Sequence, residues 1–206
     1  MLTGNSTSEM MSDADAEKIR ESHEAHASNE QDRRRRAQSG VRPLAQEPAV
    51  SDPSSGDDIR KWHRRFAMGC NNRAWRLSEA PTRSATENTE MLDAAHAAAY
   101  HWSKVGTEIH AARANMLLAH VHALLGHAEL AMQHANASFT NVTSRESPQW
   151  ELAFAHAVLA HAASVAGNAE LHARHFTLAK QMGQALPNAE EREIFEATFC
   201  RVPVPV

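Results

Sequence analysis

The chain has 206 residues, a formal net charge of −4 at pH 7 and two cysteines. This acidic balance lacks the basic excess typical of nucleic-acid-binding proteins, and two cysteines are too few for a disulfide framework or a cysteine-based zinc cluster. No apolar run reaches the about 20 residues that cross a bilayer, and the first residues lack the pattern of a signal peptide, so the sequence predicts a cytoplasmic protein without a membrane partner.

The first 56 residues are polar, rich in Ser, Asp, Glu and Pro, and poor in aromatic side chains. A segment of this composition buries too little apolar surface to offset the entropy lost on ordering, so residues 1–56 are predicted to form a disordered polar tail. Its run of four arginines, Arg33 to Arg36, is either a phosphate-binding or targeting segment or a solvated run of charge, and the second reading is favoured.

From Asp57 onward the pattern is helical, and no segment predicts a strand. Ser84, followed three residues later by Glu87, has the spacing of a helix-capping box. The prolines at 203 and 205 prevent a helix at residues 201–206, which are expected to be an extended C-terminal tail. The sequence therefore predicts an all-α domain over residues 57–200 with about seven helices, at residues 57–80, 84–106, 107–126, 127–142, 148–167, 168–186 and 188–199.

An internal repeat with a period of 41 residues occupies the second half of this domain. The segment that begins GHAELAMQHA at Gly126 returns as GNAELHARHF at Gly167, and His120 has its counterpart in His161. Each unit reads as a helix, a tight glycine turn and a second helix. A single hairpin of this kind cannot bury its apolar face alone, so the repeat predicts antiparallel hairpins that stack, with both glycines at positive φ.

Over residues 107–186 this pattern resembles the tetratricopeptide repeat family. Leu118-Ala119…Gly126 and Leu159-Ala160…Gly167 fit the spacing of its motif, whereas the early tryptophan is replaced by Asn115 and His156, and the period is 41 rather than 34. The resemblance implies a short superhelix whose concave groove binds a partner protein or peptide. By their places relative to the turn glycines, the groove would be lined by Arg113, Met116, His120, Phe154, Ala157 and His161.

The two histidines of the groove occupy the same repeat position, and packed helices lie about 8–10 Å apart, so their rings are expected to lie near each other. A groove role predicts that His120 and His161 are at least partly exposed. The alternatives are a role in the core, with buried rings, and a metal site, for which no further ligand is evident from the spacing.

A second hypothesis is a small-molecule binder or enzyme with a polar pocket in the first hairpin, centred on Asn72, His96 and His101. No phosphate-binding loop or catalytic motif is present, so a non-enzymatic interaction module is favoured, no cofactor or metal is expected, and the identity of the partner and the oligomeric state stay open. The alternative reading of these side chains is ordinary packing. The pocket would be formed by Asn71, Asn72, Trp75, His96, Tyr100, His101 and Trp102.

Overall fold

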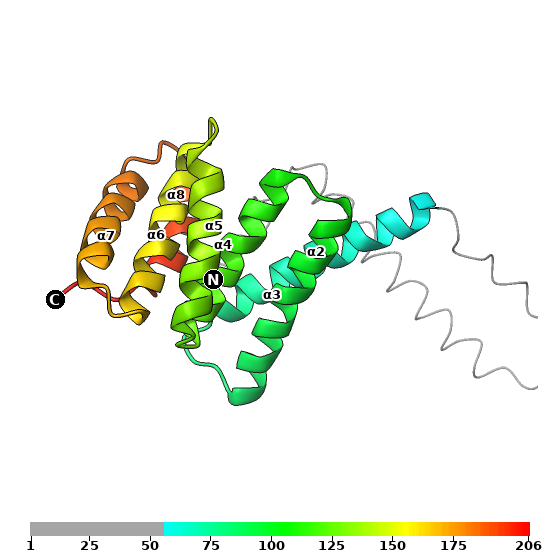
Figure 1. Cartoon of the computed structure of the whole chain (residues 1–206), viewed down its shortest axis with the longest axis horizontal. Coiled ribbons are helices and arrows are strands. Elements are labelled where there is room, and N and C mark those ends of the chain that lie inside the picture. Colours follow the sequence, from blue (N-terminus) through cyan, green and yellow to red (C-terminus); the bar gives the residue numbers. More distant parts are fainter. Residues whose placement is uncertain (1–55) are drawn as a thin grey trace, which may run out of the picture. The chain divides into compact units, whose positions relative to one another are not determined.

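The computed structural model describes residues 56–206, and the predictions for the preceding segment concern residues outside them. The described residues form seven α-helices and no strand, which confirms the all-α fold class for this part of the chain (Figure 1). Gly56 is the first residue of α2 rather than the last of a tail. The helices are α2 (Gly56–Glu79), α3 (Ala85–Val105), α4 (Glu108–Leu124), α5 (Ala128–Thr143), α6 (Gln149–Val165), α7 (Ala169–Gln184) and α8 (Ala189–Phe199).

Polar side chains fix the beginnings of three helices. The predicted capping box of α3 is confirmed: the Glu87 backbone N–H donates to the Ser84 hydroxyl, and the Glu87 carboxylate accepts from the Ser84 backbone N–H at 2.8 Å. The side chains of Asn168 and Asn188 accept backbone hydrogen bonds at the starts of α7 and α8. These contacts satisfy amide groups that have no partner within the helix, so local sequence sets where these helices start.

Glycine turns join the helices of the two repeated hairpins. Gly126 lies between α4 and α5 at φ 76°, and Gly167 lies between α6 and α7 at φ 72°. Both values fall in the left-handed region, where a side chain is unfavourable and glycine is not. The predicted positive-φ conformation is therefore confirmed at both turns.

Replacing either turn glycine by alanine should lower the free energy of unfolding by about 1–2 kcal/mol. An added Cβ would meet no atom within 4 Å at Gly126 or Gly167, so the loss would come from backbone conformation and not from a clash. Gly69 is the matched control, because it lies inside α2 with equally open space, and Gly69→Ala should raise stability by about 0.5–1 kcal/mol. Urea denaturation measures all three, and equal effects at the three sites would contradict the turn assignment.

The helices pair as antiparallel hairpins that stack side by side, α2 with α3, α4 with α5, and α6 with α7. The first helix of each hairpin also contacts the first helix of the next, and α6 contacts α8. The helices α2, α4, α6 and α8 therefore form one row, which we call the inner row, and α3, α5 and α7 form a second layer beside it (Figure 1). Stacked helical hairpins, as predicted, are the arrangement of the described residues.

The C-terminal end of α2 contacts the inner row beyond its neighbour α4. Trp75 in α2 stacks on His120 of α4 with 5.5 Å between ring centroids, and it meets Phe154 of α6 edge-on at 6.2 Å. The guanidinium of Arg201, just after α8, donates a hydrogen bond to the backbone oxygen of Glu79. The first helix therefore contacts the third hairpin and the end of α8 as well as its neighbour in the chain.

Residues 201–206 are not helical, as predicted, but part of this segment packs against the helices. Val202 is buried, and the Nε2 of His172 in α7 donates a hydrogen bond to the backbone oxygen of Pro203 at 2.8 Å. The C-terminal segment thus covers one side of α7. Among the described helices, none is both long and apolar enough to span a membrane.

Candidate functional site: the outer face of the first hairpin

The inner row does not present the predicted groove residues to a partner. Of the six, only the Arg113 side chain is partly exposed, and the other five are buried. The prediction that this set lines an accessible groove is therefore wrong for the residues that are buried inside the protein, which are Met116, His120, Phe154, Ala157 and His161.

The cause is the packing of α2 and α8 over these positions. Trp75 of α2 covers His120, and Phe195 of α8 packs edge-on against Phe154 with 5.4 Å between ring centroids. His120 and His161 do lie close together, at 5.8 Å, but as core side chains. Burial, with help from the neighbouring imidazole, lowers the pKa of His120 well below its usual value. Both rings are neutral at pH 7, so the core alternative holds for these two residues.

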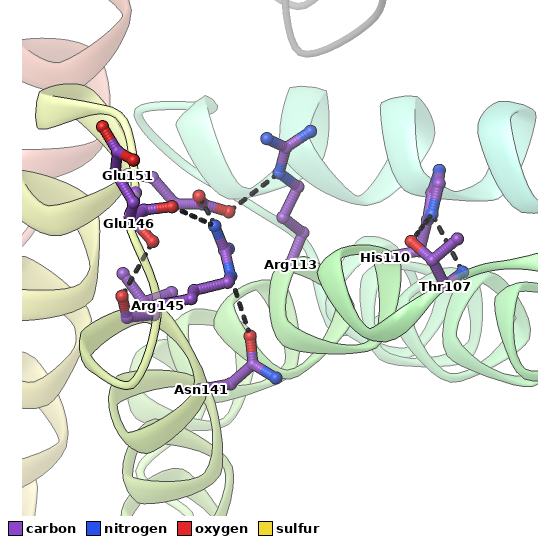
Figure 2. Close-up of polar contacts among 9 residues, drawn as sticks. Thr107, His110, Arg113, Asn141, Arg145, Glu146 and Glu151 are labelled. Atoms are coloured by element: carbon purple, nitrogen blue, oxygen red, sulfur yellow. Dashed lines mark hydrogen bonds and ion pairs between the residues drawn. The ribbon is translucent and has the colours of Figure 1, made fainter.

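Arg113 takes part in a buried ion cluster (Figure 2). Its Nε donates to Oε1 of Glu151 at 2.9 Å, and Nη2 of Arg145, from the loop after α5, donates to Oε2 at 2.8 Å. The Glu151 carboxylate is fully buried, and the Arg113 guanidinium also lies over the Trp150 ring at 4.9 Å. Arg113 therefore neutralises a buried carboxylate between the second and third hairpins, a contact that its sequence position did not reveal.

The residues predicted to form a polar pocket in the first hairpin lie on different surfaces. Trp75 is in the core, the His96 ring packs edge-on against His122 of α4 at 5.4 Å, and the Trp102 ring contacts the His110 ring in a tilted arrangement at 4.2 Å. The structure thus does not bring these side chains around one cavity. The remaining four are Asn71 and Asn72, which are half-buried and hydrogen-bonded to each other in α2, and Tyr100 and His101, which lie together near the N-terminal half of α2.

Tyr100 and His101 belong to an exposed aromatic surface that the sequence analysis did not identify. On α2, Ile59, Trp62 and Phe66 are 47–49% exposed, and Tyr100 on α3 is 56% exposed. These four are half of the eight exposed large apolar side chains in residues 56–206. The spacing 59, 62, 66 places the α2 side chains on one helical face, so the surface is continuous and not scattered.

Ring contacts hold this surface in place around His101. Trp62 stacks on Phe66 at 5.7 Å, Phe66 lies 5.4 Å from the His101 ring, and Tyr100 packs edge-on against the same imidazole at 5.3 Å. The Nδ1 atoms of His63 and His101 are 2.8 Å apart, so one ring donates a hydrogen bond to the other. Burial and the nearby His63 ring lower the pKa of His101, which favours the neutral form of the His101 ring at pH 7.

Cations lie directly beside the exposed rings. The Arg65 guanidinium is 5.5 Å from the centroid of the Trp62 ring, and the Lys104 ammonium is 4.8 Å from that of Tyr100. Residues 56–66 carry four Lys or Arg against two Asp, whereas the whole chain has a net charge of −4. The aromatic surface is thus a locally basic region on an acidic protein.

An open cleft of about 750 Å³ continues this surface between α2 and α3. Its floor has small side chains, among them Gly69 and Ala97, and its far end holds an ion pair in which Arg73 donates to both oxygens of Glu90 at 2.7 and 2.8 Å. The aromatic surface and the cleft together follow one row of positions on α2 and one on α3. We call this combined surface the outer face: Ile59, Trp62, Phe66, Gly69 and Arg73 on α2, and Thr86, Glu90, Asp93, Ala97 and Tyr100 on α3.

Among residues 56–206, α2 packs on α3, α4 and α8, and α3 packs on α2 and α4. The outer face is therefore not covered by a neighbouring hairpin of the described stack. The spacing of Ile59, Trp62 and Phe66 was a signal for such a face, but the same spacing is typical of helix positions that face a core. Comparison of the chain with models of protein families, with curated proteins and with solved structures finds no match.

Proposed function

We propose that this protein is a tetratricopeptide-like interaction module, acting by binding and not by catalysis, and that the outer face binds a helical segment of a partner protein. The observation that carries this proposal is the row of half-exposed side chains Ile59, Trp62, Phe66 and Tyr100 beside an open cleft. Large aromatic side chains beside small ones are typical of the anchors and pockets of protein interfaces.

The dimensions of the outer face favour a helix as the bound element. From Ile59 to Arg73 the α2 row spans 14 positions, which is about 21 Å at 1.5 Å per residue, or about four helical turns. The small floor residues Gly69 and Ala97 permit close approach of a helix backbone. In a stack of hairpins each repeat is covered by the next, so a partner helix would take the place of a preceding repeat.

The alternative of a small-molecule binder or enzyme has less support. Its central residues Asn72, His96 and His101 do not surround one cavity, and in residues 56–206 no group of three or more His, Cys, Asp or Glu side chains is arranged to hold a metal ion. The exposed aromatic side chains of the first hairpin, by contrast, are joined by the ring contacts around His101.

The double variant W62A/F66A tests the proposed function. We expect affinity capture from native lysate to recover a partner with the wild-type chain, and the purified partner to bind the double variant at least about 30-fold more weakly, as loss of interface anchors does. The matched control is L130A. Leu130 is similarly exposed, at 42%, but it lies on α5, which does not pack on α2 or α3. Equal affinity of the partner for wild-type protein and W62A/F66A would contradict the proposed function.

A further inference from the structure

We propose that the partner segment is an acidic amphipathic helix, whose carboxylates contact Arg65 and Lys104 while its aliphatic side chains cover Trp62, Phe66 and Tyr100. This inference rests on the proposed function and adds the chemistry of the partner. Three observations carry it: the position of the cations, their state of pairing, and the contrast with the charge of the rest of the molecule.

The two cations are placed at the aromatic end of the outer face by contact with its rings. Arg65 lies over Trp62 and Lys104 over Tyr100, one from each helix, so they flank the apolar surface on two sides. An aliphatic side chain that covers the rings would bring its helical neighbours within reach of both cations. A cation held over a ring keeps its charge and its hydrogen-bond donors available to a carboxylate.

Neither cation makes an ion pair with a described carboxylate. The ion pairs of this hairpin use other residues: Lys61 pairs with Asp58 at 3.3 Å, and Arg73 pairs with Glu90 at the opposite end of the face. Both Arg65 and Lys104 are exposed. Acidic groups of a partner would therefore gain new pairs without breaking existing ones in the described residues, which is the charge complementarity that gives an interface its specificity.

The net charge of α2 is positive, whereas that of the remaining described residues is negative. The helix α2 carries six Lys or Arg against three acidic residues, whereas α8 carries four Glu against one Arg. A basic partner would be repelled at the aromatic end of the outer face, and a neutral one would leave these cations beside an apolar contact without a counter-charge. The acidic helix is the partner that satisfies both the apolar and the charged parts of this end.

The test uses two synthetic peptides of about 15 residues, long enough to span the face. The first has leucines spaced 3 and 4 apart on one helical face and glutamates at the flanking positions, and the control peptide has lysine in place of every glutamate. Fluorescence anisotropy of labelled peptide against the full chain should give at least about tenfold tighter binding of the acidic peptide, weakening as salt is raised.

The variant R65E/K104E should weaken the acidic peptide at least about tenfold and reverse the preference between the two peptides. The matched control is R174E/K180E, which makes the same charge change at exposed positions of α7 and should leave binding unchanged. Unchanged far-UV circular dichroism and melting temperature identify the folded variants. The variant W62A/F66A should also lose the acidic peptide, because the proposal requires both rings and cations.

Equal binding of the two peptides, binding of neither, or binding that survives R65E/K104E would overturn the acidic partner. The acidic partner would also be overturned if a single-stranded oligonucleotide bound the chain, or if light scattering detected a dimer, and if W62A/F66A abolished that binding or dimer. If a captured protein partner still depends on Trp62 and Phe66 while the acidic peptide does not bind, the proposed function stands and the acidic chemistry fails.

Discussion

Lowering the pH from 7 to about 4.5 should unfold residues 56–206 cooperatively, with most of the stability lost between pH 6.5 and 4.5. Burial lowers the pKa of His161 to about 4, and burial together with neighbouring imidazoles lowers that of His122 to about 4. An ordinary histidine in an unfolded chain has a pKa near 6.5. In this pH range the unfolded chain therefore binds more protons than the folded one, and protonation favours unfolding.

The size of the effect follows from the pKa difference. Lowering a pKa from about 6.5 to about 4 corresponds to about 3 kcal/mol for the buried His161 ring and to less for His122, and the net stability of a domain is about 5–15 kcal/mol. The groups that face these rings do not offset the new charge, because they are other histidines: His96, His127 and His134 near His122, and His120 and His172 near His161. This contribution is complete above pH 6.5 and is lost as the pH falls toward 4.

Thermal melts followed by circular dichroism at constant ionic strength, from pH 8 to pH 4, measure this effect. His161→Leu supplies the internal test, because it removes one titrating group from the core. The number of protons taken up on unfolding, which sets the slope of stability against pH, should fall by up to one. A protein that melts at the same temperature at pH 8 and pH 4.5 would contradict the prediction. So would a His161→Leu variant whose stability depends on pH as steeply as that of the wild type.

Replacing Glu151 by alanine should lower the free energy of unfolding by about 3–5 kcal/mol. The Glu151 carboxylate is fully buried and binds Arg113 from α4 and Arg145 from the loop after α5, at 2.9 and 2.8 Å. Its removal leaves two guanidinium groups, both only about one-quarter exposed, without their shared counter-charge. The two cations also lie close to each other, so they would then repel.

Urea denaturation at pH 7.5 measures the change, with Glu146→Ala as the matched control. Glu146 lies in the same loop as Arg145 but is exposed, and it contacts the cluster through its backbone oxygen, which alanine retains, so its replacement should change stability by less than about 0.5 kcal/mol. Similar effects of Glu151→Ala and Glu146→Ala would show that the buried ion cluster does not join the second and third hairpins.

Local features of this fold are predictable from the sequence because their causes are local. The capping box at Ser84 and Glu87 and the positive-φ turns at Gly126 and Gly167 depend on residues within a few positions of each other, and the structure has each of them. The 41-residue repeat likewise predicts that His120 and His161 are neighbours, because equivalent positions of stacked hairpins face each other.

The exposure of those histidines could not be predicted, because it depends on elements outside the repeat. Trp75 reaches His120 only because the C-terminal end of α2 packs on α4, and Phe195 reaches Phe154 only because α8 follows the last hairpin. The pairing of Arg113 with Glu151 spans 38 residues and leaves no spacing signal. Conversely, the row Ile59, Trp62, Phe66 reads as a core face, and only the arrangement of the other helices leaves it exposed.

The contact between the two ends of the inner row has a consequence for how the domain unfolds. In an open array of repeats each unit touches only its neighbours, so terminal units can melt separately and the array loses structure in steps. Here the guanidinium of Arg201 binds the backbone of Glu79, 122 residues earlier, and Trp75 reaches Phe154 in the third hairpin. Each end therefore supports the other, and fraying of the last helix removes contacts from the first. The expected result is a single cooperative unit whose intermediate states are sparsely populated, in contrast to the stepwise melting of a linear array.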